Sequence, residues 1–158
     1  MPRTSRLLVG AALLAGVTAP AVYASLNSSA ATGPEFIRIS DRQFTYSRVD
    51  NGPPGRSPGD QEIIFDKLFN RHITPKPIGS ARFLCTFTTG RTRTCIATFD
   101  LPKGEIVATG TVRYRQFYDL AITGGTGLYD NARGTLTIIR TTDRPRPIRE
   151  FLYFRLAG

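Results

Sequence analysis

The chain has 158 residues, enough for one domain with a sizeable hydrophobic core. Its formal net charge is +9, but the basic residues occur one or two at a time and are not gathered into a stripe with aromatic residues, which argues against specific nucleic-acid binding. One histidine and two cysteines are too few for a typical zinc site, so we expect neither a metal nor a cofactor.

Residues 1–24 have the pattern of a secretory signal peptide. A basic start is followed by an apolar run from Leu7 to Val17 and by small residues that end at Ala24. The apolar run is too short to cross a bilayer, and we expect cleavage between Ala24 and Ser25. The alternative is an uncleaved anchor. The pattern predicts a secreted protein whose mature chain has no transmembrane span.

The segment that follows the signal peptide is small and polar. Residues 25–34 are expected to form a flexible leader, so the folded domain should cover residues 35–158. Asn27 begins an N-glycosylation acceptor pattern, Asn-Ser-Ser, and the sequence alone does not determine whether this site is modified.

From Glu35 onward the pattern is that of an all-β domain. Short segments of alternating apolar and polar residues are separated by Gly- and Pro-rich turns, with no helical spacing of apolar residues. Eight antiparallel strands of this length close economically into a barrel, because closure removes exposed edges. A β-sandwich also fits the pattern. The expected strands are 36–49 (bent), 61–70, 81–88, 93–101, 105–114, 116–123, 134–142 and 149–156.

A glycine-rich stretch, 121–134, joins two of the expected strands. We interpret it as a sharp corner in which Gly124, Gly125, Gly127 and Gly134 have a structural role, since glycine adopts positive φ and lets two backbones approach closely. A phosphate-binding loop would require Lys-Ser/Thr and a following helix, but the exit from this stretch is β-patterned.

The two cysteines are placed symmetrically about the turn at Gly90. In a hairpin Cys85 and Cys95 would face each other, so the sequence predicts a disulfide between them. Period-two spacing puts these cysteines on one wall of the interior. The wall comprises Phe83, Cys85 and Phe87 opposite Cys95, Ala97 and Phe99.

Two of the expected strands carry large apolar residues on both faces. These segments, 62–69 and 151–156, have more apolar surface than a solvated outer face requires. We therefore expect a homo-oligomer or, failing that, a covering segment such as the Pro-rich loop 51–59.

The sequence contains no nucleophile elbow, catalytic triad pattern or dinucleotide fingerprint. A barrel interior with a few polar groups in an apolar wall suits a small hydrophobic ligand. Asp66 shares a strand face with Ile64 and Leu68, and desolvation there would raise its pKa and let it act as an acid. The alternative is that Asp66 pairs with an arginine such as Arg38 or Arg82.

The glycine corner, with Ala132-Arg-Gly134 after it, resembles the signature of allene oxide cyclases and, more loosely, of plant dirigent proteins. Further pieces agree in order, so the resemblance extends from about Glu35 to the end: Gly59-Asp60, 66–69, 99–106 and 153–156. It implies an eight-stranded calycin-type barrel that binds a small hydrophobic unsaturated substrate and promotes ring closure by holding one conformation. It also implies a trimer, although a dimer would satisfy the burial argument equally well.

The resemblance transfers to this chain only in part. Asp66 falls where plant allene oxide cyclases have a pocket asparagine, and it resembles the strand aspartate of dirigent proteins. The cyclase pocket tyrosine falls on Val112, and the first-strand glutamate has no match in register, with Glu35 the nearest candidate. Two functions follow: a cyclase- or isomerase-like enzyme with Asp66 and Glu35 as candidate catalytic residues, or a dirigent-like or carrier module that binds without turnover.

Overall fold

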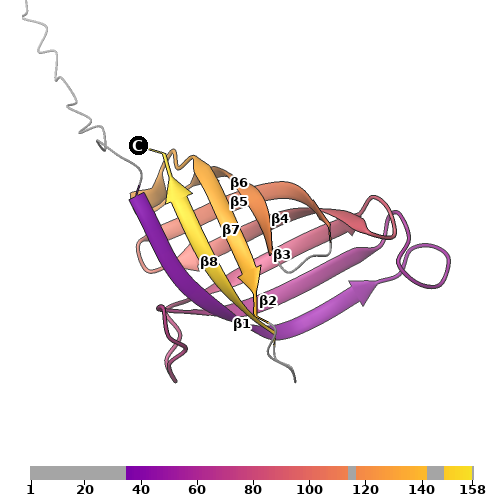
Figure 1. Ribbon diagram of the computed structural model, residues 1–158, viewed down its shortest axis with the longest axis horizontal. Coiled ribbons are helices and arrows are strands. Elements are labelled where there is room, and N and C mark those ends of the chain that lie inside the picture. Colours follow the sequence, from indigo (N-terminus) through magenta and orange to yellow (C-terminus); the bar gives the residue numbers. More distant parts are fainter. Residues whose placement is uncertain (1–34, 114–116, 142–147, 158) are drawn as a thin grey trace, which may run out of the picture.

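The computed structural model describes residues 35–113, 117–141 and 148–157, which form a closed barrel of eight antiparallel strands (Figure 1). The expected signal peptide, leader and Asn27 lie outside the described residues. The strands are β1 (Glu35–Val49), β2 (Gln61–Phe69), β3 (Gly79–Phe87), β4 (Thr92–Leu101), β5 (Gly104–Arg113), β6 (Phe117–Gly125), β7 (Gly134–Arg140) and β8 (Arg149–Leu156).

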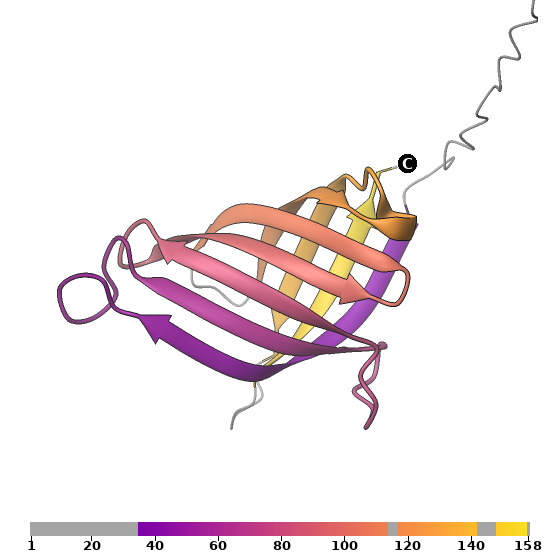
Figure 2. The same cartoon turned by 180° about the vertical axis from the view of Figure 1, so that it is seen from behind.

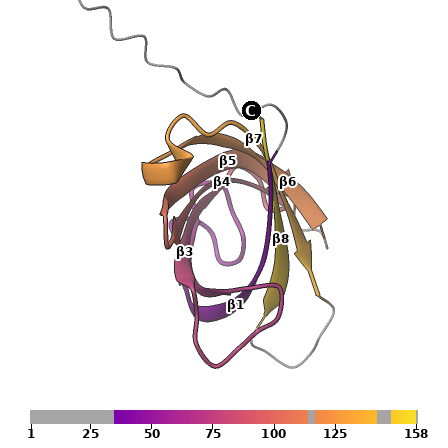
Figure 3. The same cartoon turned by 90° about the vertical axis from the view of Figure 1, so that its left-hand side faces the viewer.

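The barrel has a simple up-and-down order. Each strand pairs with its sequence neighbours, and β1 closes the ring against β8, from Glu35 opposite Leu156 to Arg42 opposite Arg149. Figure 3 shows the ring of strands from one end. The structure confirms the eight-stranded barrel over the sandwich, with strand bounds within three residues of those expected. Within the described residues the only helical element is the 3-10 turn η1 (Gly127–Tyr129).

The first strand is bent, as expected, and the bend has a specific cause. The pairing of β1 with β2 shifts register between Gln43 and Thr45, so one extra residue, Phe44, is left without a partner across the ladder. Such a bulge bends the strand that carries it, and β1 curves around the barrel in Figures 1 and 2. Residues 35–39 of β1 pair with β8 alone, residues 40–42 pair with both β8 and β2, and the remainder of the strand pairs with β2 alone.

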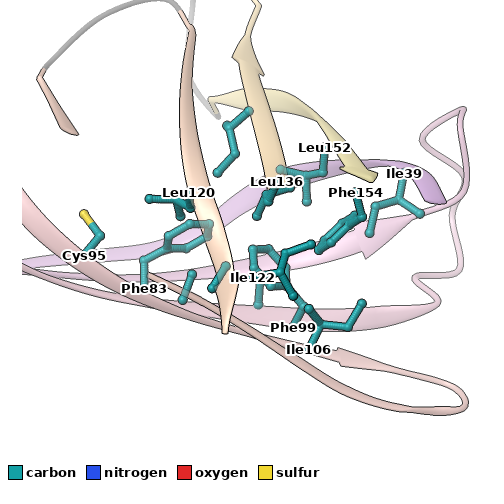
Figure 4. Close-up of a cluster of buried hydrophobic side chains, with 14 of the residues drawn as sticks. Ile39, Phe83, Cys95, Phe99, Ile106, Leu120, Ile122, Leu136, Leu152 and Phe154 are labelled. Atoms are coloured by element: carbon teal, nitrogen blue, oxygen red, sulfur yellow. The ribbon is translucent and has the colours of Figure 1, made fainter. Parts of the chain in front are cut away.

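Alternating inward side chains fill one part of the barrel with apolar atoms (Figure 4). The ring of Phe99 contacts Phe83 and Phe154 edge-on, at centroid distances of 5.5 and 5.0 Å. This geometry suits the ring quadrupoles and packs aromatic side chains densely. Buried neighbours of these rings are Ile39, Leu68, Ile106, Ile122, Leu136 and Leu152.

The predicted disulfide is present in the β3–β4 hairpin. Cys85 and Cys95 are directly opposite in the ladder, with their Cα atoms 4.0 Å apart, and both side chains are buried. The remaining residues of the expected interior wall are buried as well. A covalent link therefore joins two adjacent strands in the middle of the interior wall.

The glycine corner connects β6 to β7 through η1, and its glycines do not share one role. Gly127 has φ +62°, and a Cβ there would collide with the carbonyl oxygen of Lys103. Gly125 does not have positive φ, but a Cβ would collide with the carbonyl oxygens of Tyr129 and Glu105. At Gly124 a Cβ would meet nothing within 4 Å, so its expected structural role stays a prediction.

The fourth glycine of the corner lies at the start of β7. Gly134 has φ +140°, and a Cβ there would collide with the carbonyl oxygen of Arg155 on β8. Its lack of a side chain therefore allows β7 to pair closely with β8, where it stands opposite Leu156.

The outer surface retains the large apolar side chains that suggest association. Phe117, Ile139, Phe151 and Tyr153 are partly exposed on adjacent strands β6, β7 and β8, and we call them the outer patch. Phe65 on β2 is also exposed, at 42%. The homo-oligomer thus stays a prediction. Separately, no helix in the described part of the chain is long and apolar enough to span a membrane.

A candidate active site with three buried carboxyl groups

The barrel interior changes from apolar to polar near the start of β8. A pocket of about 20 Å³, room for roughly one water molecule, lies there between strands and beside Ile148. Its walls combine apolar groups with acids: Asp41, Gln43, Ile64, Asp66, Phe83, Tyr118, Ile148 and Glu150. Gln43, Ile64, Tyr118 and Ile148 are only half-buried, so the polar end is less enclosed than the apolar core.

Three carboxyl groups reach this pocket from three strands. Asp41 on β1, Asp66 on β2 and Glu150 on β8 are 1%, 6% and 6% exposed. Each lies in phase with the inward residues of its strand, because side chains alternate between the two faces. Asp41 and Glu150 are directly opposite in the β1–β8 ladder. Strand periodicity and register therefore place these three acids around one space.

The carboxyl groups of Glu150 and Asp41 are partly satisfied. The Arg140 Nε donates a hydrogen bond to Glu150 Oε1 at 2.9 Å, and the Glu150 backbone N–H donates to Asp41 Oδ1 at 2.9 Å. The other oxygen of Asp41, Oδ2, is buried and has no hydrogen-bond partner among the described residues. Burial, with the nearby charges of Glu150 and Asp66, holds the pKa of Asp41 well above its ordinary value.

Asp66 has the properties expected of a desolvated acid. Burial, with a smaller contribution from the charge of Glu150, raises its pKa to about 7, although the charge of Arg140 acts in the opposite direction. Its Oδ1 has no hydrogen-bond partner in the described part of the chain. The alternative pairing with Arg38 or Arg82 is not made, since both are exposed on the outer face, where Arg82 instead approaches Asp100 at 3.9 Å.

Tyr118 brings a phenol to the same pocket from β6. Burial and the charge of Glu150 raise the pKa of Tyr118 far above its ordinary value, so the hydroxyl keeps its proton and remains able to donate it in a hydrogen bond. The position at which the resemblance expects a tyrosine, Val112, is buried apolar wall on β5. A tyrosine is therefore present in the pocket, but from the next strand.

Glu35 does not join this site. It is the first residue of β1, is exposed, and pairs with Leu156 at the end of β8 remote from Glu150. Asp41 follows six positions later on the same strand, a separation of roughly 20 Å at 3.3 Å per residue. The first-strand acid of the pocket is thus Asp41, and the expectation for Glu35 was wrong in placement.

Sequence reasoning missed Asp41, Tyr118 and Glu150, although a signal was present for two of them. Asp41 continues the inward series of Ile37 and Ile39, and Glu150 begins the inward series of β8. An acid in phase with buried apolar residues on adjacent strands marks a shared interior site. Tyr118 gave no comparable signal, because an inward aromatic residue is more often core.

Two further buried acids have structural partners. Glu62, fully buried on β2, forms an ion pair with Arg93 on β4 and accepts a hydrogen bond from the Tyr46 hydroxyl at 2.8 Å. Asp60 accepts hydrogen bonds from the Ser57 backbone, at 2.8 Å, and from the Arg48 guanidinium, at 2.7 Å. Such satisfied groups fix the β1–β2 connection and differ from Asp41 and Asp66, each of which has an oxygen without a hydrogen-bond partner among the described residues.

No family model matches the chain, and no curated protein sequence matches it. Solved structures do. A structure described as pyocyanin demethylase has 27% sequence identity and a TM-score of 0.63, with 76% of this chain and 100% of that chain covered. The likeness spans the whole of that protein.

Two less identical structures share the fold. The Diels-Alderase AbmU from Streptomyces koyangensis is 16% identical, with a TM-score of 0.61 and coverage of 82% of this chain and 72% of that chain. A pterocarpan synthase dirigent protein is also 16% identical, with a TM-score of 0.63 and coverage of 79% and 85%. These likenesses confirm the barrel fold that the resemblance to cyclases and dirigent proteins implies.

Proposed function

We propose that this protein binds a small unsaturated molecule at the acid-lined end of its barrel and promotes a cyclase- or isomerase-like rearrangement of it. The observation that carries the proposal is Asp66, a buried carboxyl group with a pKa raised to about 7 and one unpartnered oxygen facing a pocket. Near neutral pH such a group exists in both protonation states, so it can deliver a proton and take one back.

The neighbouring groups support an acid–base role for Asp66. Tyr118 is a hydrogen-bond donor at the same pocket, and Glu150 is held in place by Arg140. Phe83 and Ile64 supply apolar wall against which an unsaturated skeleton can be oriented. Orientation of a flexible substrate in one reactive conformation can itself supply much of the rate enhancement, and a positioned acid adds to it.

The fold comparisons support small-molecule chemistry of this kind. Among the similar barrels are two proteins described as Diels-Alderases, two as pterocarpan synthase dirigent proteins and one as a pyocyanin demethylase. The proposed site is not an apolar cavity inside the barrel, because buried side chains fill the apolar half of the barrel. We place the ligand at the polar end, where the pocket must widen to admit more than a water molecule.

Secretion is part of the proposal. The signal-peptide pattern of residues 1–24 is supported by the Cys85–Cys95 disulfide, since disulfides persist in oxidising compartments outside the cytosol.

The second candidate function is a dirigent-like or carrier module without turnover. The departures from the cyclase pattern at Val112 and Glu35 favour this candidate. It is weakened because Tyr118 and Asp41 bring a tyrosine and a first-strand acid to the pocket from other positions. The two functions differ in one requirement: only catalysis needs a proton to be transferred at Asp66.

The test uses the ligand that co-purifies with the protein from its native host, identified by mass spectrometry. That ligand is incubated with wild type, with Asp66→Asn, and with Asp130→Asn, which changes an exposed aspartate in the glycine corner. At saturating ligand, an enzyme loses about 10²–10⁴-fold in product formation in Asp66→Asn, whatever the change in its affinity, and Asp130→Asn turns the ligand over like wild type. If wild type binds the ligand but leaves it unchanged, the catalytic proposal fails and the binding module stands.

A further inference from the structure

The pocket presents more hydrogen-bond acceptors than the described residues satisfy. Asp41 Oδ2 and Asp66 Oδ1 are both buried and lack a partner among the described residues. Native structures rarely leave buried polar atoms unpaired, because each loses its contacts with water and gains nothing in return. Two such atoms around one small pocket are acceptors that the donor group of a ligand could satisfy.

The charges around the pocket have one prevailing sign. Asp41, Asp66 and Glu150 bring three carboxyl groups, and Arg140 is the cation hydrogen-bonded to one of them. Above about pH 7, where Asp66 is ionised, an incoming carboxylate would meet a like charge in a poorly solvated space, where such charges repel strongly. An incoming cation or N–H group would find acceptors already in place. The ionised pocket therefore discriminates against anionic groups.

The side walls favour a flat group. Phe83 and Tyr118 present aromatic rings and Ile64 an aliphatic side chain on the same lining as the acids. A planar cation can donate hydrogen bonds in its plane to carboxylates while its faces contact such rings.

We propose that the ligand is a planar nitrogen compound, a cation or a neutral N–H donor, whose nitrogen end is held by Asp41 and Asp66. This inference deepens the proposed function and rests on it only in taking the acid-lined pocket as the ligand site. It adds a nitrogen end that donates hydrogen bonds to the small hydrophobic unsaturated substrate implied by the resemblance.

The proposal has a pH dependence of known sign. A cation binds best when the carboxyl groups facing it are ionised, so affinity rises as the pH increases through about 7, where Asp66 loses its proton. The other titratable or charged groups facing Asp66 are Asp41, Glu150, Arg140 and Tyr118. Arg140 and Tyr118 keep their protons over this range and do not reverse the trend.

The experiment compares benzamidine, a planar cation with two N–H donors, with benzoate, its anionic counterpart of the same shape. Binding of each is measured by protein-observed NMR titration at pH 5.5 and 8.0. At pH 8.0 we expect benzamidine to bind at least about tenfold more tightly than benzoate, and to weaken about tenfold or more in Asp66→Asn or Asp41→Asn. Asp130→Asn should bind like wild type.

A second variant removes pocket size as an explanation for failure. Ile64→Ala shortens a half-buried side chain of the lining without changing a charge. If neither wild type nor Ile64→Ala prefers benzamidine to benzoate, or if Asp66→Asn does not weaken the preference, the proposal is overturned. Because the probes are not substrates, a preference for benzamidine without turnover of the native ligand would leave this inference standing while the proposed catalysis failed.

Discussion

Replacing Asp66 by asparagine should make the protein more stable at alkaline pH and alter how its stability depends on pH. The ordinary pKa of the group is 3.8, and in the folded protein burial raises it to about 7. A group whose folded pKa is raised contributes stability in its protonated form. That contribution is fully present below about pH 4 and is lost as the pH rises towards 7. The difference between the unfolded and folded pKa of Asp66 corresponds to about 4 kcal/mol.

The asparagine variant lacks this titration because its amide is neutral at every pH. Its free energy of unfolding should therefore rise relative to wild type by up to about 4 kcal/mol between pH 4 and pH 8. The observed change will be smaller than that limit if water relaxes into the pocket. Some pH dependence should remain in the variant, because the pKa of Asp41 is also raised. The main causes of that rise are burial and the charge of Glu150, and the charge of Asp66 is a smaller cause.

The assay is urea unfolding at pH 4, 6 and 8, at one protein concentration so that association is constant. Asp130→Asn is the matched control, because it makes the same chemical change at an exposed position, and it should follow wild type at each pH. If wild type and Asp66→Asn show parallel profiles from pH 4 to 8, Asp66 is not the desolvated acid described above, and both its catalytic role and its ligand contact lose their basis.

Three other predictions concern the barrel itself. Replacing Cys85 and Cys95 together by alanine should cost about 2.5–3 kcal/mol in urea unfolding, because the disulfide closes a loop within one hairpin; an unchanged midpoint would contradict it. Gly125→Ala should lower the free energy of unfolding by about 1–3 kcal/mol, since the added methyl group collides with two carbonyl oxygens. Gly124→Ala should change it by less than about 0.5 kcal/mol. Equal losses in urea unfolding would refute the distinction between the two glycines. Light scattering at a protein concentration of roughly tens of micromolar should give the mass of an oligomer. Phe151→Asp should reduce that mass to the mass of a monomer. A monomeric wild type would contradict the predicted association.

Local pattern alone was enough to predict the strands and the disulfide. Period-two alternation and turn residues place a strand within a few positions, because the backbone of a strand exposes successive side chains to opposite faces. The Cys85–Cys95 pair followed from symmetry about Gly90, which depends only on the geometry of one hairpin. The eight-strand count followed in the same way, while the choice of a barrel over a sandwich needed the resemblance.

The candidate site was predicted less completely, because it depends on contacts between distant parts of the chain. Asp66 could be picked out from its neighbours on one strand, but its pKa is set partly by Glu150, which lies far along the chain and reaches the pocket only because β8 and β1 close the barrel. Asp41 is brought opposite Glu150 by the same closure. Glu35 was the nearest candidate for the first-strand glutamate that the resemblance implies, and the register of β1 against β8 placed it at the other end.

The sequence by itself determined which residues alternate inward, which cysteines pair and where the chain turns, since each is a property of one strand or one hairpin. The tertiary structure alone decided which inward residues share a space. Closure of β1 onto β8 gathered Asp41, Asp66 and Glu150 around a pocket and filled the rest of the barrel with Phe99, Phe154 and their neighbours. The desolvation that raises the pKa of Asp66 arises only from that closure, because burial of a carboxyl group depends on everything packed around it.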